Sequence, residues 1–219
     1  SELKQAGLKD SLLPPHSTSE SRLPLKNPAA WYGQTEARRI ADILVSFQTP
    51  AGGWSKNLDM TQHRRAPGEQ FAGHSTPMHV DPLDNDKPRD MHWSYVGTFD
   101  NSATTTQMRY LAKVITATDA GQNAACRKAF LHGLDYLFAA QYPNGGWPQV
   151  WPLQGGYHDA VTFNDGAMIN VLELLKDVAD GATDFRWVPQ ETRTAAAASL
   201  KRGLACVLEA QISAGDRRT

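Results

Sequence analysis

The chain has 219 residues, with 22 Lys and Arg residues against 23 Asp and Glu residues, so its formal net charge is only -1. This balance excludes the strongly basic surface on which nucleic-acid binding depends. The mean hydropathy of -0.47 and the lack of an apolar run near the roughly eighteen residues of a membrane span predict a soluble protein with no membrane segment.

Residues 1–30 are expected to form an N-terminal arm, because they carry several prolines and serines but no sustained apolar period. The main domain is expected over 31–219, and its first apolar period predicts a helix that starts near Gln34. The polar, irregular segment from Ser55 to Thr98 predicts a long loop. Helical periods then return after Asn101 through Ile115, and over about 125–141, 165–178 and 195–211.

Two of the predicted helices end in almost the same sequence. The segment QTPAGGW at 48–54 corresponds to QYPNGGW at 141–147, and TFDNSA at 98–103 corresponds to TFNDGA at 162–167. The repeating unit is therefore a helix, a Gly-Gly-Trp turn, a loop, a Thr-Phe-acidic turn and a second helix. A third copy begins in the last predicted helix, where Gln211 aligns with Gln141, and it lacks its second helix.

Stacked antiparallel helix pairs of this kind predict an all-α fold, an α/α toroid of about three repeats, with equivalent loops gathered around a cleft at one end. In the repeat register, Cys126 and Cys206 differ by about ten residues along equivalent helices, which is roughly 15 Å of rise. A disulfide spans at most about 7 Å between Cα atoms. The sequence therefore predicts two free, mostly buried thiols.

The Gly-Gly-Trp turns have a structural and a functional interpretation. A glycine pair is expected where a helix ends in a left-handed residue, and each tryptophan can then cover the exposed helix end. Alternatively, Trp54 and Trp147 form a stacking wall for sugar rings. Lys56 would in that case point a cation into the same cleft, although a solvated surface lysine is the simpler interpretation.

The Thr-Phe-acidic turns can be explained by helix capping alone, since a Thr, Asp or Asn at each turn can cap the helix that follows. A cap needs only one such residue, however, and each turn pairs an acid with a carboxamide, Asp100 with Asn101 and Asp165 with Asn164. Two carboxylates and two carboxamides suit Ca²⁺, or alternatively an acid and base pair. His158 is placed to reach the same cleft, or is a hydrogen-bonded structural histidine.

Four segments in this order resemble polysaccharide lyase family ten, the pectate lyases with an α/α toroid core. They are QTPAGGWSKNLDM, TFDNSATTTQMRYLAKV, AAQYPNGGWPQVWP and TFNDGAMINVLELL, and the match runs from about residue 31 to the chain end. The resemblance implies cleavage of polygalacturonate (pectate) by Ca²⁺-assisted β-elimination, which leaves unsaturated oligogalacturonides.

By position, Asp100 and Asn101 resemble the family's first acidic turn, and Asp165 resembles its second. The resemblance implies that these three residues hold Ca²⁺, and through it the uronate carboxylate, so that Asp100 and Asp165 act catalytically through the metal. A divalent ion there stabilises the charge that develops when the C5 proton leaves. The candidate substrate-binding residues around this site are Lys56, Trp54, Trp147 and His158.

The sequence departs from the family in its last segment. The family's base is an arginine expected after the third helix-end turn, beyond Thr219, and neither Arg217 nor Arg218 matches its motif. The expectation is therefore the metal side of a cleft without its base, either as a fragment of a longer enzyme or as a chain that has lost the remainder.

Three other functions fit parts of the pattern. A glycoside hydrolase on the same toroid would use Asp100 and Asp165 as acid and base, without a metal. Terpene cyclases and prenyltransferases share the Q-x-x-x-G-x-W motif, but the sequence has neither of their DDxxD and DxDD clusters. A non-catalytic pectin-binding module would use Trp54 and Trp147 as its platform.

The implied partner is a polygalacturonate chain, with no nucleic acid and no membrane, and the protein is expected to act as a monomer. Since polygalacturonate is an extracellular plant polymer, the expected location is secreted or periplasmic.

Overall fold

A computed structural model describes residues 2–14, 22–72, 96–214 and 217–218 of the chain, and most of these are helical or lie in turns. The helices and 3₁₀ turns are α1 (Glu2–Ala6), η1 (Ala29–Gly33), α2 (Thr35–Ser46), η2 (Asp100–Ser102), α3 (Thr105–Ala117), α4 (Ala124–Ala140), η3 (Tyr157–Asp159), η4 (Asn164–Gly166), α5 (Ala167–Asp180), η5 (Thr183–Phe185) and α6 (Gln190–Glu209). The strands are β1 (Gly97–Thr98), β2 (Val150–Trp151), β3 (Ser213–Ala214) and β4 (Arg217–Arg218). No helix in the described ranges is long and apolar enough to cross a membrane.

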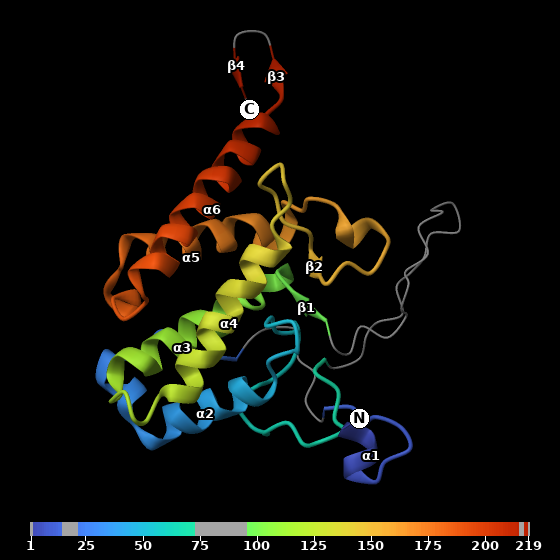
Figure 1. The fold of residues 1–219 in the computed structure, drawn as a ribbon, viewed down its shortest axis with the longest axis vertical. Coiled ribbons are helices and arrows are strands. Elements are labelled where there is room, and N and C mark those ends of the chain that lie inside the picture. Colours follow the sequence, from blue (N-terminus) through green and yellow to red (C-terminus); the bar gives the residue numbers. More distant parts are fainter. Residues whose placement is uncertain (1, 15–21, 73–95, 215–216, 219) are drawn as a thin grey trace.

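The five long helices confirm the helical class expected from the sequence. Helix α3 lies against α4, and α5 lies against α6, while α2 packs on both α3 and α4 (Figure 1). The strands are two-residue pairs, in which β1 and β2 join antiparallel, as do β3 and β4. The all-α expectation thus holds for the helical assembly, and the strand pairs are an addition that apolar periodicity did not reveal.

Helix α6 starts five residues before its predicted start near Ala195. Its first turns carry Gln, Glu, Thr, Arg and alanine, and they place few residues in the core. A helix of this composition forms through intrinsic propensity, which leaves no apolar period to mark its start. Pro189 stands immediately before the first helical residue, which is the usual place for a proline at a helix start.

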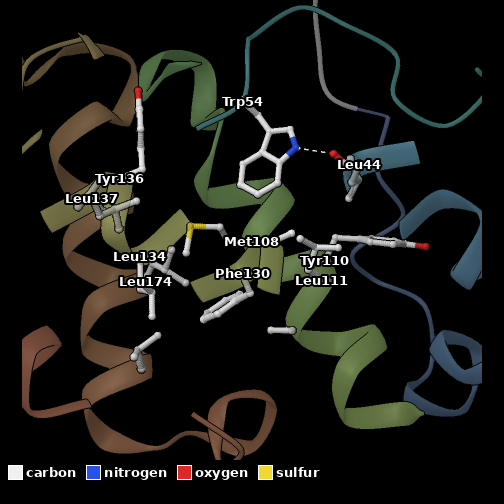
Figure 2. Close-up of a cluster of buried hydrophobic side chains, with 14 of the residues drawn as sticks. Leu44, Trp54, Met108, Tyr110, Leu111, Phe130, Leu134, Tyr136, Leu137 and Leu174 are labelled. Carbon is white, nitrogen blue, oxygen red and sulfur yellow. Dashed lines mark hydrogen bonds between the residues drawn. The ribbon is translucent and has the colours of Figure 1, made fainter. Parts of the chain in front are cut away.

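One hydrophobic core lies between the helices. Side chains of α2, α3, α4 and α5 meet in it, together with Trp54 from the first Gly-Gly-Trp turn (Figure 2). Both cysteines are free and buried, which confirms the prediction of two unpaired thiols.

The two Gly-Gly-Trp turns have the same backbone and the same hydrogen bonds. Gly52 and Gly145 occupy equivalent positions at φ values of 110° and 90°. In each turn the preceding glutamine side chain donates to the carbonyl of that glycine, at 2.7 Å from Gln48 and 2.9 Å from Gln141. The same amide group also donates to a helix of the next unit, at Ala129 in α4 or in the middle of α6. The internal repeat read from the sequence is therefore a structural repeat.

Loop segments of the two copies are joined by backbone hydrogen bonds. The Thr98 amide donates to the carbonyl of Trp54, and the Thr162 amide donates to that of Trp147, each at 3.0 Å. Between the copies, β1 pairs with β2, and the amide of Phe99 donates to the carbonyl of Gln149. These bonds hold the residues that precede both acidic turns in one framework.

The arm predicted over residues 1–30 contains a short helix, α1, which the sequence pattern did not reveal. Glu2 forms an ion pair with Arg65, and Leu12 pairs with Glu69 through an isolated parallel bridge. The described part of the arm therefore lies on the loop after α2. Residues 15–21 of the arm, and residues 73–95 of the predicted long loop, lie outside the described residues.

Candidate functional site

The two acidic turns, η2 and η4, lie against each other where α3 and α5 begin. They share an unusual backbone, because Asn101 and the equivalent Asp165 both have a φ of 51°. A hydrogen bond of 3.0 Å from Asn170 Nδ2 to Ser102 Oγ links the two copies. The structure therefore brings together the turns that the sequence predicted to meet.

Helix capping does not explain these turns. The residues that precede α3 and α5 are Thr104 and Gly166, and neither helix start has a side-chain capping bond. Thr104 instead uses its hydroxyl to join the first turn to the Gly-Gly-Trp loop, because it accepts from the Trp54 amide and donates to the Thr98 carbonyl. The acidic and carboxamide side chains are thus available for another role.

Asp100 is the most deeply buried member of the cluster, with 3% of its surface exposed. Its backbone amide donates to Thr98 Oγ1 at 3.1 Å, which orients the turn. Its Oδ2 atom contacts the ammonium group of Lys56, whereas its Oδ1 atom is buried and has no hydrogen-bond partner among the described residues. A buried carboxylate oxygen without a donor is costly, and it marks a position where a further cation or donor fits.

Lys56 lies in the loop after the first Gly-Gly-Trp turn, and its side chain is 40% exposed. The ion pair with Asp100 places it in the site rather than on a solvated surface. The expectation that this lysine points a cation into the same cleft is consistent with that geometry.

His158 lies in η3 and is buried, with 7% of its surface exposed. The ring of Tyr157 covers it, with ring centroids 3.7 Å apart. Burial lowers the pKa of His158 to about 4, and the nearby charge of Lys56 acts in the same direction, so the imidazole is neutral at neutral pH. The negative charges of Asp100 and Asp159 oppose this lowering of the pKa without reversing it.

Asn101 and Asp165 are exposed, in contrast to Asp100. Asn101 donates through Nδ2 to Asn57 Oδ1 at 3.3 Å, and Asn164 donates to Asp165 Oδ2 at 2.7 Å. Asn57 was not singled out from the sequence. The residue at the same distance after Trp147 is the apolar Val150, so comparison of the repeats gave no signal for Asn57.

The structure corrects the expectation that Trp54 and Trp147 form a sugar-stacking wall. Both side chains are fully buried. Each indole N–H donates to a carbonyl in the last turns of the preceding helix. Trp54 donates to Leu44 at 2.7 Å (Figure 2), and Trp147 donates to Leu137 at 2.8 Å. With no ring face open to a ligand, they cover helix ends and are structural.

The donor set suits a hard cation, although it is not a cluster of many acids. Among the described residues, no group of three or more His, Cys, Asp or Glu side chains is arranged to hold a metal. The candidate ligands are two carboxylates and a carboxamide, from Asp100, Asp165 and Asn101, and the partnerless Oδ1 of Asp100 shows that this set has an oxygen to offer. Oxygen donors of these types are those that Ca²⁺ prefers.

Comparisons with known proteins identify the family of the chain. A sequence model for a family described as pectic acid lyase matches residues 48–219. A solved family 10 polysaccharide lyase from Cellvibrio cellulosa has 30% sequence identity and a TM-score of 0.62, and the match covers 89% of this chain and 54% of that one. A variant of a family 10 polysaccharide lyase from the same organism, in complex with trigalacturonic acid, also has 30% identity and a TM-score of 0.62, with 86% and 53% covered. No curated protein matches the chain.

The chain spans about half the length of these solved lyases. The family match nevertheless extends over most of its residues and includes both Gly-Gly-Trp turns and both acidic turns. This chain belongs to the pectic acid lyase family.

Proposed function

We propose that this chain forms the metal-binding side of a pectate lyase active site, which cleaves polygalacturonate by Ca²⁺-dependent β-elimination. The observation that carries the proposal is the meeting of the two acidic turns around Asp100, whose buried Oδ1 lacks a partner among the described residues. The bound trigalacturonic acid of the similar Cellvibrio lyase supports an oligogalacturonate as the ligand.

Asp100, Asn101 and Asp165 are the residues that would hold the ion. When bound, the ion would neutralise the uronate carboxylate and stabilise the negative charge that develops as the C5 proton leaves. Asp100 would contribute a buried, desolvated carboxylate. Asn101 and Asp165 would contribute side-chain oxygens from the solvent-exposed part of their turns. His158 is neutral and so adds no charge of its own.

The reaction also needs a base that takes the C5 proton as the bond from C4 to the departing sugar oxygen breaks. We assign this role to no residue of the present chain. The proposal for these residues is therefore metal holding and substrate orientation, and the full reaction is proposed for the enzyme that contains them.

The architecture that we propose for that enzyme is an α/α toroid. The repeated order of α2 and α3, of α4 and α5, and the start of a third unit in α6 supports it, because the glutamine of each Gly-Gly-Trp turn donates to a helix of the next unit. We further propose a monomer that acts outside the cytoplasm, secreted or periplasmic, since its substrate is an extracellular polymer.

The test is the ultraviolet absorbance of polygalacturonate incubated with the purified enzyme that contains this chain, with Ca²⁺ and with a chelator. A rise that needs Ca²⁺ is expected for the enzyme, and Asp100→Asn and Asp165→Asn are each expected to reduce it about 100-fold or more, as removal of a charge-stabilising group does. Asp180→Asn is the matched control, because this carboxylate lies at the far end of α5 and is exposed. Activity is expected to be unchanged in this variant.

Other outcomes identify the competing functions. Cleavage that continues in chelator and yields no unsaturated product would show a glycoside hydrolase. Binding of oligogalacturonate without cleavage, by a chain that includes the complete catalytic segment, would show a pectin-binding module. Unchanged activity of Asp100→Asn would remove the proposed metal site from the mechanism.

A further inference from the structure

The two carboxylate oxygens of Asp100 have different surroundings. Oδ2 faces the ammonium group of Lys56, and Oδ1 has no hydrogen-bond partner in the described ranges although it is buried. A desolvated carboxylate needs a compensating charge, and within the described residues Lys56 is the one cation paired with it. The lysine therefore serves as the counter-ion of the carboxylate when no metal is bound.

Comparison of the two repeats shows that this pair is a special feature of the first copy. Lys56 stands two residues after Trp54, and the residue two after Trp147 is Gln149. Asp100 corresponds in the same way to Asn164. Both members of the charged pair are thus replaced by neutral amides in the second copy, so the repeat fold does not need the charges.

The lysine is free to move, whereas the carboxylate is not. Asp100 is fixed by its turn and by the Thr98 hydroxyl, and 3% of its surface is exposed. The Lys56 side chain is 40% exposed and reaches the site from a loop. A long, partly solvated ammonium group can leave its partner at much lower cost than a buried carboxylate can.

We propose that Lys56 is a resident counter-cation that occupies Asp100 in the metal-free protein and competes with the divalent ion for it, so that its positive charge sets the Ca²⁺ affinity of the site. This proposal rests on the proposed function for the identity of the ion. Two cations within a few ångströms of one carboxylate repel each other, so Ca²⁺ at Oδ1 binds more tightly once the ammonium group on Oδ2 moves away. The displaced lysine then lies beside the metal, where a uronate carboxylate can accept it.

The test is isothermal calorimetry of Ca²⁺ binding to the purified protein at fixed ionic strength, with and without oligogalacturonate. Lys56→Gln, which places the second copy's residue in the first, is expected to bind Ca²⁺ about tenfold more tightly than the wild type. Lys56→Arg keeps the charge and is expected to bind within about threefold of the wild type. Lys113→Gln removes the same charge from an ion pair with Asp184 elsewhere and is expected to leave the affinity unchanged.

Two further variants complete the design. Lys56→Met tests the loss of charge without a new amide, and thermal unfolding checks that each variant is folded. Asp100→Asn together with Lys56→Gln copies the second repeat at both positions, and its Ca²⁺ affinity is expected to be lower than that of Lys56→Gln alone. A KM for oligogalacturonate that rises in Lys56→Gln while kcat is kept is expected if the released ammonium meets the substrate.

Equal or weaker Ca²⁺ binding by both Lys56→Gln and Lys56→Met would overturn the proposal, as would an absence of Ca²⁺ binding to every variant. The lyase assay decides the proposed function separately. Tighter binding in Lys56→Gln without any unsaturated product from the enzyme would refute the lyase function and leave the competition at Asp100 established.

Discussion

Trp54 and Trp147 show how a polar atom on an aromatic side chain can serve a fold. Each indole lies fully in the core, and its N–H donates to a carbonyl near the end of the preceding helix. The sequence could not decide between this role and sugar stacking, because a glycine pair before a tryptophan leads equally well to a ring that turns inward or outward.

The first prediction concerns the indole N–H of Trp54. Trp54→Phe keeps most of the apolar volume but removes the indole hydrogen bond to the Leu44 carbonyl, so the free energy of unfolding should fall by about 0.5–1.5 kcal/mol. Urea unfolding measures this loss. KM of the enzyme for oligogalacturonate should stay the same. A raised KM in a Trp54→Phe variant with wild-type stability would instead indicate that Trp54 stacks on the sugar.

The second prediction concerns the thiols. Burial raises the pKa of Cys126 to about 11, and burial also raises the pKa of Cys206. The reactive thiolate is therefore nearly absent at pH 8, and the native protein should resist alkylation, whereas the denatured chain should be modified at both positions. The folded state keeps the proton longer than the unfolded state, so stability should decrease as pH rises from about 9 towards 11. Mass spectrometry after iodoacetamide treatment at pH 8 measures the first effect.

The site residues were predictable to the extent that the two copies repeat. Asp100, Asn101 and Asp165 were found because two similar phrases put acids at equivalent turns, and those turns do meet. The burial of Asp100 and its contact with Lys56 were not predictable, because the loop that carries Lys56 has no apolar period to fix where its side chains point.

At the scale of elements, the Gly-Gly-Trp turns act as joints between successive helices. Gly145 lies at a φ of 90°, and an added Cβ would stand 2.1 Å from the carbonyl oxygen of Arg202 in α6. Gly52 meets the carbonyl oxygen of His132 in α4 in the same way, at 2.5 Å. Glycine is needed here both for the left-handed backbone and for the close approach of the next helix.

The third prediction uses this contrast between glycines. Gly145→Ala should lower the free energy of unfolding by about 2 kcal/mol or more, through backbone strain and the clash with α6. Gly121→Ala is the matched control, since an added Cβ there meets nothing within 4 Å, and it should change stability by less than about 0.5 kcal/mol. Equal effects of the two substitutions on thermal unfolding would contradict the requirement for glycine at position 145.

Helix positions were largely predictable, and helix ends less so. Amphipathic α2 and α3 follow their apolar spacing, because one stripe faces the core. The start of α6 was missed because its residues favour a helix by intrinsic propensity and show no apolar period. The short strands were missed because two-residue pairings depend on contacts between distant segments, which no local pattern records.

At the scale of the whole molecule, the helical assembly ends at α6. The face of α6 that contains Gly203 packs on α5 and Trp147, and the other face exposes Leu204 and Leu208 one turn apart. These leucines contribute little to the core of the chain as it stands.

The fourth prediction follows from this exposure. Replacement of both Leu204 and Leu208 by Lys should change the free energy of unfolding of the present chain by less than about 1 kcal/mol. Leu174→Ala, inside the core, should cost about 2–5 kcal/mol and serves as the contrast. Urea unfolding of the two variants compares these effects. A large decrease in the free energy of unfolding of the Leu204→Lys, Leu208→Lys variant would show that this face of α6 is covered.

The order of the helical units was predictable from the repeat, but the closure of a ring was not, because closure depends on how many units follow one another. What the structure does show is that the loops of neighbouring units are tied together. The amides of Thr98, Phe99 and Thr162 donate to carbonyls of the preceding Gly-Gly-Trp turn or of the other copy's loop.

The backbone hydrogen bonds between these loops should slow amide hydrogen exchange. Amides in irregular loops usually exchange with solvent within seconds to minutes, because local opening is cheap. The amide of Phe99 donates across the two copies to the carbonyl of Gln149. The amides of Thr98, Gln149 and Thr162 donate within their own copies, to the carbonyls of Trp54, His158 and Trp147. Since each of these bonds joins two separate loop segments, an amide is exposed only when two segments move apart. Their protons should therefore exchange as slowly as those in the middle of α3 and α4, and mass spectrometry of deuterium uptake would find the slowest loop amides of the chain directly beneath its acidic turns.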